Sequence, residues 1–215
     1  MKRIFIINRF GDFNWRTVGV LSAVALVFAV LGFMGLDLWL FSHLRSYNIG
    51  AWYWFDILGK WKVILAVSVA LFGVSRLMHQ RKFQMAFGNA TLAIIAAMFV
   101  TGILKIAFGR MRPLMYEALG YTEFRPFSLS HTFHSFPSGH TAAALAFLVS
   151  LGIIFPKIRW ATWTISFFVA LSRIAIGAHW PSDVVIGALI GTAAAYFIIY
   201  VRKNYLAYLL EKRQK

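Results

Sequence analysis

The chain of 215 residues is 60% hydrophobic and only 13% charged, whereas soluble proteins carry roughly a quarter charged residues. It contains no cysteine, which excludes disulfide bonds and zinc–thiolate sites. The net charge of +15 is not accompanied by a basic run with interleaved aromatic residues, so the sequence does not indicate a nucleic-acid-binding protein. Basic residues also collect on the cytoplasmic loops of membrane proteins, and we interpret the charge in that way.

Long apolar stretches predict helices that cross a bilayer. Residues 17–36 contain no charge, and neither do residues 83–104, whereas the hydrocarbon core of a membrane requires about 20 apolar residues in a helix. We therefore predict an all-α, polytopic membrane protein with a single membrane-embedded domain over residues 1–215. Six transmembrane spans are expected near residues 17–40, 60–79, 84–104, 138–156, 160–178 and 182–201.

The first span and the two weakest spans rest on separate arguments. The first 16 residues are basic, and the apolar stretch after them is longer than the roughly 7–15 residues of a signal-peptide core, so we expect an uncleaved span. The second and fifth spans are free of charge only over residues 63–75 and 160–172. Arg173 lies inside the fifth span, and intramembrane charges are costly and often mark a functional site.

The distribution of Lys and Arg predicts the orientation of the chain. The two terminal segments and the connections near residues 76–82 and 157–159 hold 14 of the 22 Lys and Arg residues. By the positive-inside rule, these segments and both termini are expected in the cytoplasm. The aromatic segment 47–58 is then expected in the outer interface, where aromatic rings favour the headgroup level.

One connection and one glycine pair also call for interpretation. Residues 113–137 form a loop of 25 residues, and connections beyond roughly 12–15 residues are uncommon and usually functional or disordered. Gly187 and Gly191 form a GxxxG pattern in the sixth span. We interpret this pattern as close packing inside the bundle, in preference to a dimer face.

Three segments hold almost all the polar groups that a membrane would not tolerate without a reason. They are residues 105–113 at the end of the third span, 137–140 at the start of the fourth, and 172–183 across the end of the fifth and the start of the sixth. With the N-terminus inside, all three fall at the outer face. Segments that are distant in sequence are therefore predicted to converge at one depth.

These segments offer residues that suit a multiply charged oxyanion such as phosphate. Lys105, Arg112 and Arg173 provide three cations. Ser138 and Gly139 are expected to open a helix, and a helix N-terminus presents free backbone N–H groups and a partial positive charge. A glycine there lets a ligand approach the backbone closely.

The same segments contain two histidines and a carboxylate. His140 and His179 can transfer protons or attack phosphorus. Pro181 suits the first turn of a helix, which places Asp183 in that turn and His179 just before it. A carboxylate in this position can accept a hydrogen bond from one nitrogen of His179 and leave the other nitrogen as the nucleophile.

Between Lys105 and Asp183 the sequence contains, in this order, K-x6-R-P, P-S-G-H and S-R-x5-H-x3-D. These segments resemble the three motifs of the type 2 phosphatidic acid phosphatase superfamily, and the six-span layout is similar to its membrane lipid phosphatase branch. The resemblance implies an enzyme of the bacterial inner membrane that hydrolyses a phosphomonoester or pyrophosphate on a lipid. The implied substrates are of the undecaprenyl pyrophosphate, phosphatidylglycerophosphate or phosphatidic acid type, with a lipid A phosphatase or a lipid-to-lipid phosphotransferase as alternatives.

The resemblance also implies a role for each motif residue. His179 would attack phosphorus and form a phosphohistidine, Asp183 would orient it, and His140 would protonate the leaving oxygen and then activate water. The phosphate oxygens would be held by Lys105, Arg112, Arg173, Ser138 and the Gly139 backbone. No metal or other cofactor is expected. The expected partners are a lipid phosphate substrate and membrane lipids, with no nucleic acid and no obligate protein partner.

Two other interpretations of these residues remain open. His140, His179 and Asp183 could form a metal site of two histidines and one carboxylate, although three neighbouring cations would repel a metal. An anion transporter would need a similar anion site, but it is expected to have paired halves with broken helices. The sequence shows no such symmetry.

Several polar residues lie outside the motifs. Four basic residues of the loop region are interpreted as solvated, with headgroup recognition as the alternative: Arg110, Arg125, His131 and His134. His43 and His79 lie near span ends and are expected at the interface. Asp37 and Asp56 are expected on the outer side and are given no role.

Overall fold

The structure is a computed structural model that describes residues 15–213. Within these residues the chain is helical, without a strand. The longer helices are α1 (Trp15–Leu31), α4 (Trp61–Leu77), α5 (Arg81–Phe108), α7 (Gly139–Ile154), α8 (Arg159–Ala175) and α9 (Pro181–Arg213). The shorter elements are η1 (Gly32–Leu36), α2 (Asp37–Leu44), α3 (Gly50–Gly59), α6 (Pro113–Leu119), η2 (His131–Phe133) and η3 (Pro156–Ile158). The expected all-α class is confirmed.

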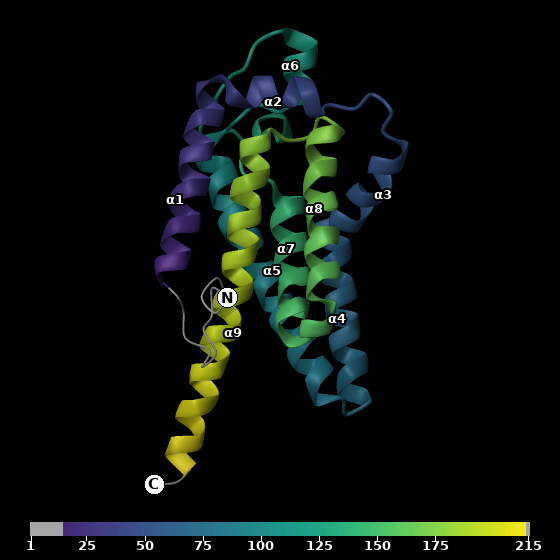
Figure 1. The fold of residues 1–215 in the computed structure, drawn as a ribbon, viewed down its shortest axis with the longest axis vertical. Coiled ribbons are helices and arrows are strands. Elements are labelled where there is room, and N and C mark those ends of the chain that lie inside the picture. The colour runs from purple at the N-terminus through teal and green to yellow at the C-terminus, as the bar shows by residue number, and fades with distance from the viewer. Residues whose placement is uncertain (1–14, 214–215) are drawn as a thin grey trace.

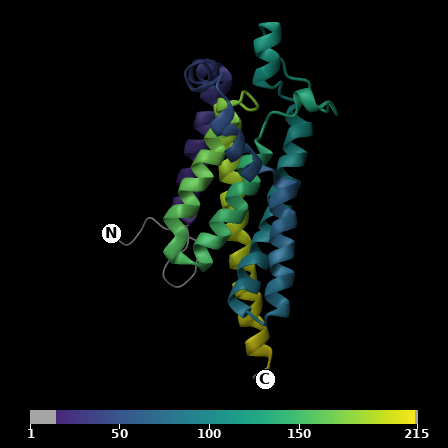
Figure 2. The same cartoon turned by 90° about the vertical axis from the view of Figure 1, so that its right-hand side faces the viewer.

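The six longer helices correspond in order to the six expected spans, and they run along the bundle in two perpendicular views (Figure 1; Figure 2). By length and apolarity, three segments of the described chain could cross a bilayer: Arg16–Leu44, Arg81–Phe108 and Pro181–Tyr205. A fourth is added if α3 and α4, bent by 52°, form one broken span. With 16 and 17 residues, α7 and α8 are shorter than the roughly 20 residues that a straight span requires.

The first expected span, residues 17–40, is not one straight helix. α1 ends at Leu31, the π-helical turn η1 follows, and Gly35 within it takes a φ of +123°, which glycine adopts at little cost because it has no Cβ. α2 then lies across the end of the bundle, side-on in Figure 1 and end-on in Figure 2. The bend brings the Asp37 carboxylate to the start of α9, where Oδ1 accepts a hydrogen bond from the Ser182 backbone N–H at 2.8 Å.

α7 lies in the middle of the bundle and packs against α5, α8 and α9. Its residues 142–146 are buried, and four of the five are alanines that allow close approach of the neighbouring helices. A Cβ added at Gly187 would lie 2.5 Å from the Ser138 carbonyl oxygen, and one at Gly191 would overlap the Ala142 carbonyl oxygen. The interpretation of the GxxxG pattern as packing inside the bundle is confirmed. This packing holds the start of α7 against α9.

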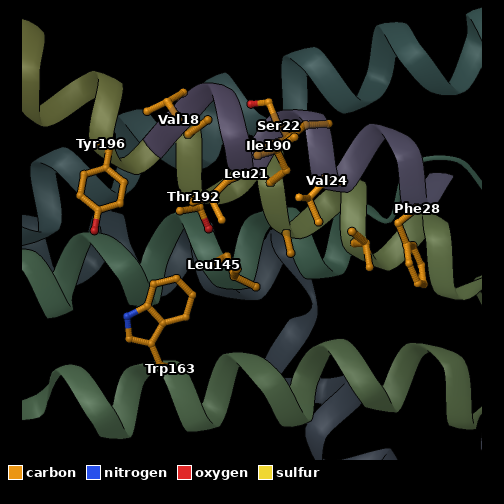
Figure 3. Close-up of a pocket in the computed structure, with 15 residues that line it drawn as sticks. Val18, Leu21, Ser22, Val24, Phe28, Leu145, Trp163, Ile190, Thr192 and Tyr196 are labelled. Atoms are coloured by element: carbon orange, nitrogen blue, oxygen red, sulfur yellow. The ribbon is translucent and has the colours of Figure 1, made fainter. Parts of the chain in front are cut away.

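The outer surface of the bundle is rich in exposed apolar side chains, among them Val24, Phe99 and Phe167, which suits a lipid environment. An apolar cavity of about 670 Å³ lies between α1, α7, α8 and α9. Figure 3 shows residues of α1 on one side of this cavity and Trp163 of α8 on the other. None of its lining residues is charged, so the cavity is not a candidate phosphate site.

Candidate active site

The three polar segments contact one another in the folded chain. The Ser138 backbone N–H donates to the Asp183 carbonyl oxygen at 2.9 Å, and Lys105 Nζ donates to the Pro137 carbonyl oxygen at 2.6 Å. Arg112 Nη1 donates to the Ala178 carbonyl oxygen at 3.2 Å. The end of α5, the start of α7 and the connection from α8 to α9 therefore form one site, at the end of the bundle where α2 and α6 lie (Figure 1).

His179 lies in the connection between α8 and α9 and is 2% exposed. α9 begins at Pro181, so Asp183 falls in its first turn, four residues after the histidine. Asp183 Oδ2 lies 3.5 Å from His179 Nδ1, beyond the usual hydrogen-bond distance. Nδ1 has no hydrogen-bond partner among the described residues. The carboxylate thus faces the imidazole without a formed hydrogen bond.

Other donors fix the Asp183 carboxylate, which is fully buried. Oδ1 accepts from Arg110 Nη1 at 2.6 Å. Oδ2 accepts from the Ser135 hydroxyl and from the Trp180 backbone N–H, at 2.5 and 2.9 Å. A buried carboxylate with this many donors is held in one orientation. Its position toward His179 is therefore set by groups other than the histidine.

The surroundings of His179 keep its imidazole uncharged. Burial first, and then the positive charges of Arg112, Lys105 and Arg173, lower the pKa of His179 well below its ordinary value. Burial disfavours the charged form of a histidine, and nearby cations add to that effect. His179 therefore has a free nitrogen lone pair near neutral pH, which is the form that acts as a nucleophile.

The start of α7 forms a second part of the site. Ser138 is the N-cap of α7, and its Oγ accepts from the Thr141 backbone N–H, as expected for a serine in this position. An added Cβ at Gly139 would lie 3.4 Å from Met98 and 3.8 Å from the Lys105 side chain. His140 follows in the first turn and is partly exposed. The prediction that Ser138 and Gly139 open a helix is confirmed.

Two of the predicted cations hold the loop that precedes α7. Lys105 Nζ donates to the carbonyl oxygens of His134 and Pro137, at 2.8 and 2.6 Å. Arg112 donates to the carbonyl oxygens of His131 and His134, at 3.1 and 3.3 Å. These side chains therefore bring positive charge to the site and also position the backbone of residues 131–137.

The third predicted cation, Arg173, forms a buried ion pair that sequence reasoning did not predict. Its Nη1 contacts Asp56 of α3, and its Nε has no hydrogen-bond partner among the described residues. α3 also reaches the site at Gly59, where an added Cβ would lie 3.4 Å from His140. The sequence did contain a sign of this ion pair, because Asp56 is the one acidic residue in the otherwise apolar stretch 49–59. A buried charge is costly unless it is paired.

Arg110 is not the solvated loop residue that the sequence indicated. It is 6% exposed and forms ion pairs at 2.6 Å with Asp37 and with Asp183. Asp37, to which no role was given, is 1% exposed. The prediction was wrong because the partners of Arg110 come from α2 and α9, each more than 70 residues away in sequence.

The other loop residues differ from Arg110. Arg125 is 59% exposed and pairs with Glu123, so its interpretation as a solvated residue is confirmed. His131 is exposed, with Nε2 3.3 Å from Arg112 Nη2. The charge of Arg112 and then burial lower the pKa of His131. His134 Nε2 lies within hydrogen-bond distance of the Ser128 carbonyl oxygen, at 2.8 Å.

The fold and site together define a class of protein. It is a helical bundle with helices of membrane-spanning length, and one end carries an uncharged histidine, a buried carboxylate and several cations. Such a set of side chains suits phosphoryl chemistry. The sequence profile of the PAP2 superfamily matches residues 86–206, which include all three polar segments. The chain belongs to the PAP2 superfamily.

Several characterised proteins are similar to this chain. A lipid A 1-phosphatase of Rhizobium johnstonii is 36% identical over 98 residues, which cover 46% of this chain and 40% of the relative. An undecaprenyl-diphosphatase of Sulfolobus acidocaldarius is 28% identical over 115 residues, or 53% of each chain. The crystal structure of Aquifex aeolicus LpxE matches with a TM-score of 0.59 and 26% identity, over 76% of this chain and 94% of that chain. The match thus spans about two fifths of the lipid A 1-phosphatase.

Proposed function

We propose that this protein is an integral membrane enzyme that hydrolyses a phosphate group on a lipid. The observation that carries this proposal is the environment of His179, which is buried, uncharged near neutral pH and faces a fixed carboxylate 3.5 Å away. Lys105, Arg112 and Arg173 supply positive charge around it. Its relatives in the PAP2 superfamily are named as lipid phosphatases, which supports a lipid substrate.

In the first half-reaction, His179 Nε2, the nitrogen that does not face Asp183, attacks phosphorus. The bond from phosphorus to the leaving oxygen breaks, and His140 donates a proton to that oxygen. The product is a phosphohistidine and the dephosphorylated lipid. Asp183 stabilises the positive charge that develops on the imidazole, in the way that a carboxylate supports the histidine of a catalytic triad.

In the second half-reaction, water attacks the phosphohistidine. His140, now unprotonated, removes a proton from that water, the bond between phosphorus and Nε2 breaks, and inorganic phosphate leaves. Lys105, Arg112, Arg173 and the backbone N–H groups at the start of α7 hold the phosphate oxygens, because positive groups stabilise the charge that builds up on them. Arg173 must exchange Asp56 for phosphate in this step.

The lipid A 1-phosphate class is the first candidate substrate, because two relatives with that name are each 36% identical to this chain over 98 residues. Undecaprenyl diphosphate is the second, because two relatives named for that activity match about half of the chain. Both substrates place a phosphate at the membrane surface and the hydrocarbon chains inside the bilayer. A lipid-to-lipid phosphotransferase would use the same phosphohistidine with another acceptor than water.

A phosphate-release assay with purified protein in detergent tests the function. The panel contains lipid A 1-phosphate, undecaprenyl diphosphate, phosphatidylglycerophosphate and phosphatidic acid, each with and without excess EDTA. We expect phosphate release that EDTA does not reduce and that vanadate inhibits, because vanadate can mimic the pentacoordinate phosphorus on His179. Loss of activity in EDTA with recovery in zinc or magnesium would favour the metal-site alternative. No release from any lipid, with anion flux in liposomes, would favour a transporter.

We also propose a six-span topology with both termini in the cytoplasm and the site at the outer, periplasmic face of a bacterial inner membrane. The 14 Lys and Arg residues of the terminal segments and of the connections at residues 76–82 and 157–159 support this orientation. An outward site would act on lipids of the outer leaflet and release phosphate outside the cytoplasm. It would therefore suit lipids that have already been flipped across the membrane.

Single cysteines test this orientation, since the native chain has none. Leu129, in the long loop, is 83% exposed, and Met78, in the turn between α4 and α5, is 63% exposed. We expect Leu129→Cys to react with a membrane-impermeant thiol reagent in intact spheroplasts, and Met78→Cys to react only after permeabilisation. The reverse pattern would place the site in the cytoplasm and contradict the proposed topology.

A further inference from the structure

A buried charged network joins α2 to the first turn of α9. Asp37, Arg110 and Asp183 are 1%, 6% and 0% exposed. Arg110 lies between the two carboxylates, with Nη1 2.6 Å from Asp183 Oδ1 and Nη2 2.6 Å from Asp37 Oδ2. Arg110 is one of the unspecified positions of K-x6-R-P, and Asp37 lies outside all three polar segments. Neither takes part in the reaction steps described above.

We propose that Arg110 and Asp37 are positioning residues for the reaction, acting on His179 through Asp183. Arg110 fixes the Asp183 carboxylate and offsets part of its charge, and Asp37 fixes Arg110. Ser135 and the Trp180 backbone N–H complete the set of donors to Asp183. The carboxylate then presents Oδ2 to His179 Nδ1. The inference rests on the proposed role of His179 as the nucleophile.

The surroundings of Arg110 make its ion pairs with Asp37 and Asp183 strong and directional. Its guanidinium carbon lies 4.5 Å from the centre of the Phe33 ring and 5.4 Å from that of Trp180. These rings exclude water, and charged groups interact more strongly where water is absent. A planar guanidinium can also donate to two carboxylates at once in fixed directions. Arginine is therefore suited to hold Asp37 and Asp183 in one arrangement.

Asp37 fixes the start of α9 as well as Arg110. Its Oδ1 accepts from the Ser182 backbone N–H at 2.8 Å, and its Oδ2 accepts from the Ser182 hydroxyl. A carboxylate at a helix N-terminus is favourable because it meets free N–H groups and a partial positive charge. The approach is close, since an added Cβ at Gly32 would lie 2.8 Å from both Asp37 Oδ2 and Ser182 Cβ. Asp37 lies outside the region that matches the superfamily profile, residues 86–206.

The net charge of the network is opposite in sign to the charge that develops on His179 during the reaction. Two carboxylates and one guanidinium have a net charge of −1, which balances the positive charge that His179 gains when it attacks phosphorus. Without Arg110, two buried carboxylates would share a site with no guanidinium between them, and carboxylates that share a site do not both ionise readily. Lys105 and Arg112 also act on Asp183, and they remain in such a variant. The remaining cations would offset only part of the lost charge.

The test compares full-length variants in detergent on whichever lipid the wild type hydrolyses. For Arg110→Gln we expect kcat to fall by roughly 10- to 100-fold, the range known for removal of an outer-shell partner that orients a metal ligand, with KM little changed. We expect the acid limb of the kcat profile to move to higher pH, because activity requires an ionised Asp183. Vanadate inhibition should weaken in parallel with kcat, whereas inhibition by inorganic phosphate should not.

Three further variants separate positioning from folding. Arg110→Lys restores a positive charge but cannot donate to both carboxylates in one plane, so we expect the acid limb to return toward that of the wild type with partial recovery of kcat. Asp37→Asn should give a smaller loss of kcat than Arg110→Gln, because it does not contact Asp183. Arg125→Gln removes an exposed arginine between α6 and η2 and should leave all these values unchanged.

The possible outcomes are distinct. If the wild type releases no phosphate from any lipid, the proposed function fails. A second outcome is that the wild type is active and Arg110→Gln has a lower thermal stability but the same kcat, vanadate inhibition and pH profile as the wild type. In that case the network is structural and the inference is wrong. If Arg110→Gln does not fold, Arg110→Lys and Asp37→Asn provide the test. A wild-type kcat and a wild-type pH profile in both of these variants would overturn the inference.

Discussion

Replacing His179 by alanine is expected to reduce phosphate release by roughly 10⁴-fold or more, because removal of the nucleophile from a covalent mechanism leaves only binding and electrostatic stabilisation. Substrate affinity should change little, since Lys105, Arg112 and Arg173 remain. Phosphate release measures the effect on turnover. Rapid quenching in alkaline detergent, in which a phosphohistidine is stable, with a ³²P-labelled substrate measures the phosphoenzyme, which should form in the wild type and be absent from the variant.

A matched control for this variant is His43→Ala. His43 lies in α2, and its Nδ1 lies within hydrogen-bond distance of the Trp39 carbonyl oxygen and the Ser42 hydroxyl of the same helix. Both contacts are exposed. We expect wild-type turnover for the control. Wild-type turnover in His179→Ala, or a labelled phosphoenzyme that persists in it, would assign the nucleophile to another residue and refute the proposed mechanism.

Replacing His140 by alanine is expected to reduce turnover of a lipid substrate by about 10²- to 10⁴-fold, the usual contribution of a general acid–base group. The loss should depend on the leaving group. A phosphate ester of p-nitrophenol needs little protonation when the bond to phosphorus breaks, so phosphoenzyme should still form. Because water would no longer be activated, the second half-reaction should be slow and the labelled phosphohistidine should accumulate.

Comparing the lipid with the p-nitrophenyl ester separates the loss of proton donation from a general loss of activity. In the wild type, hydrolysis of the phosphoenzyme is expected to be fast, so the level of phosphoenzyme at steady state should be low for both substrates. In His140→Ala, the ratio of the rates of phosphoenzyme formation on the p-nitrophenyl ester and on the lipid should rise by at least about 10-fold. Equal losses on both substrates, without accumulation of phosphoenzyme, would exclude His140 as the proton donor.

Much of the fold was predictable because membrane helices are determined by local composition. A bilayer requires an apolar stretch of sufficient length, and such stretches are visible in the chain without knowledge of their neighbours. Helix boundaries near α7 and α9 were predictable for a local reason too, since Ser138 and Pro181 favour helix starts. The bend after α1 was not, because the sequence around Gly35 is apolar apart from Asp37 and continues the pattern of a span.

The sequence by itself also determined the residues that could carry the chemistry. Histidine, aspartate and the cations occur in three short segments whose internal spacing depends only on local structure, as His179 and Asp183 show on either side of a helix start. The family could be recognised from those spacings, and the superfamily profile agrees. The sequence left the roles of Arg110, Asp37 and Asp56 undetermined or wrongly assigned.

Only the tertiary structure decided how the charges of the site are paired. Asp37 reaches Arg110 because the chain bends at Gly35 and α2 crosses the end of the bundle, and Asp56 reaches Arg173 because α3 packs against α8. A buried charge must find a partner, but sequence does not say which of several carboxylates will be close enough in space. That choice depends on how helices pack, which the small residues of α7 and α9 determine through contacts between distant parts of the chain.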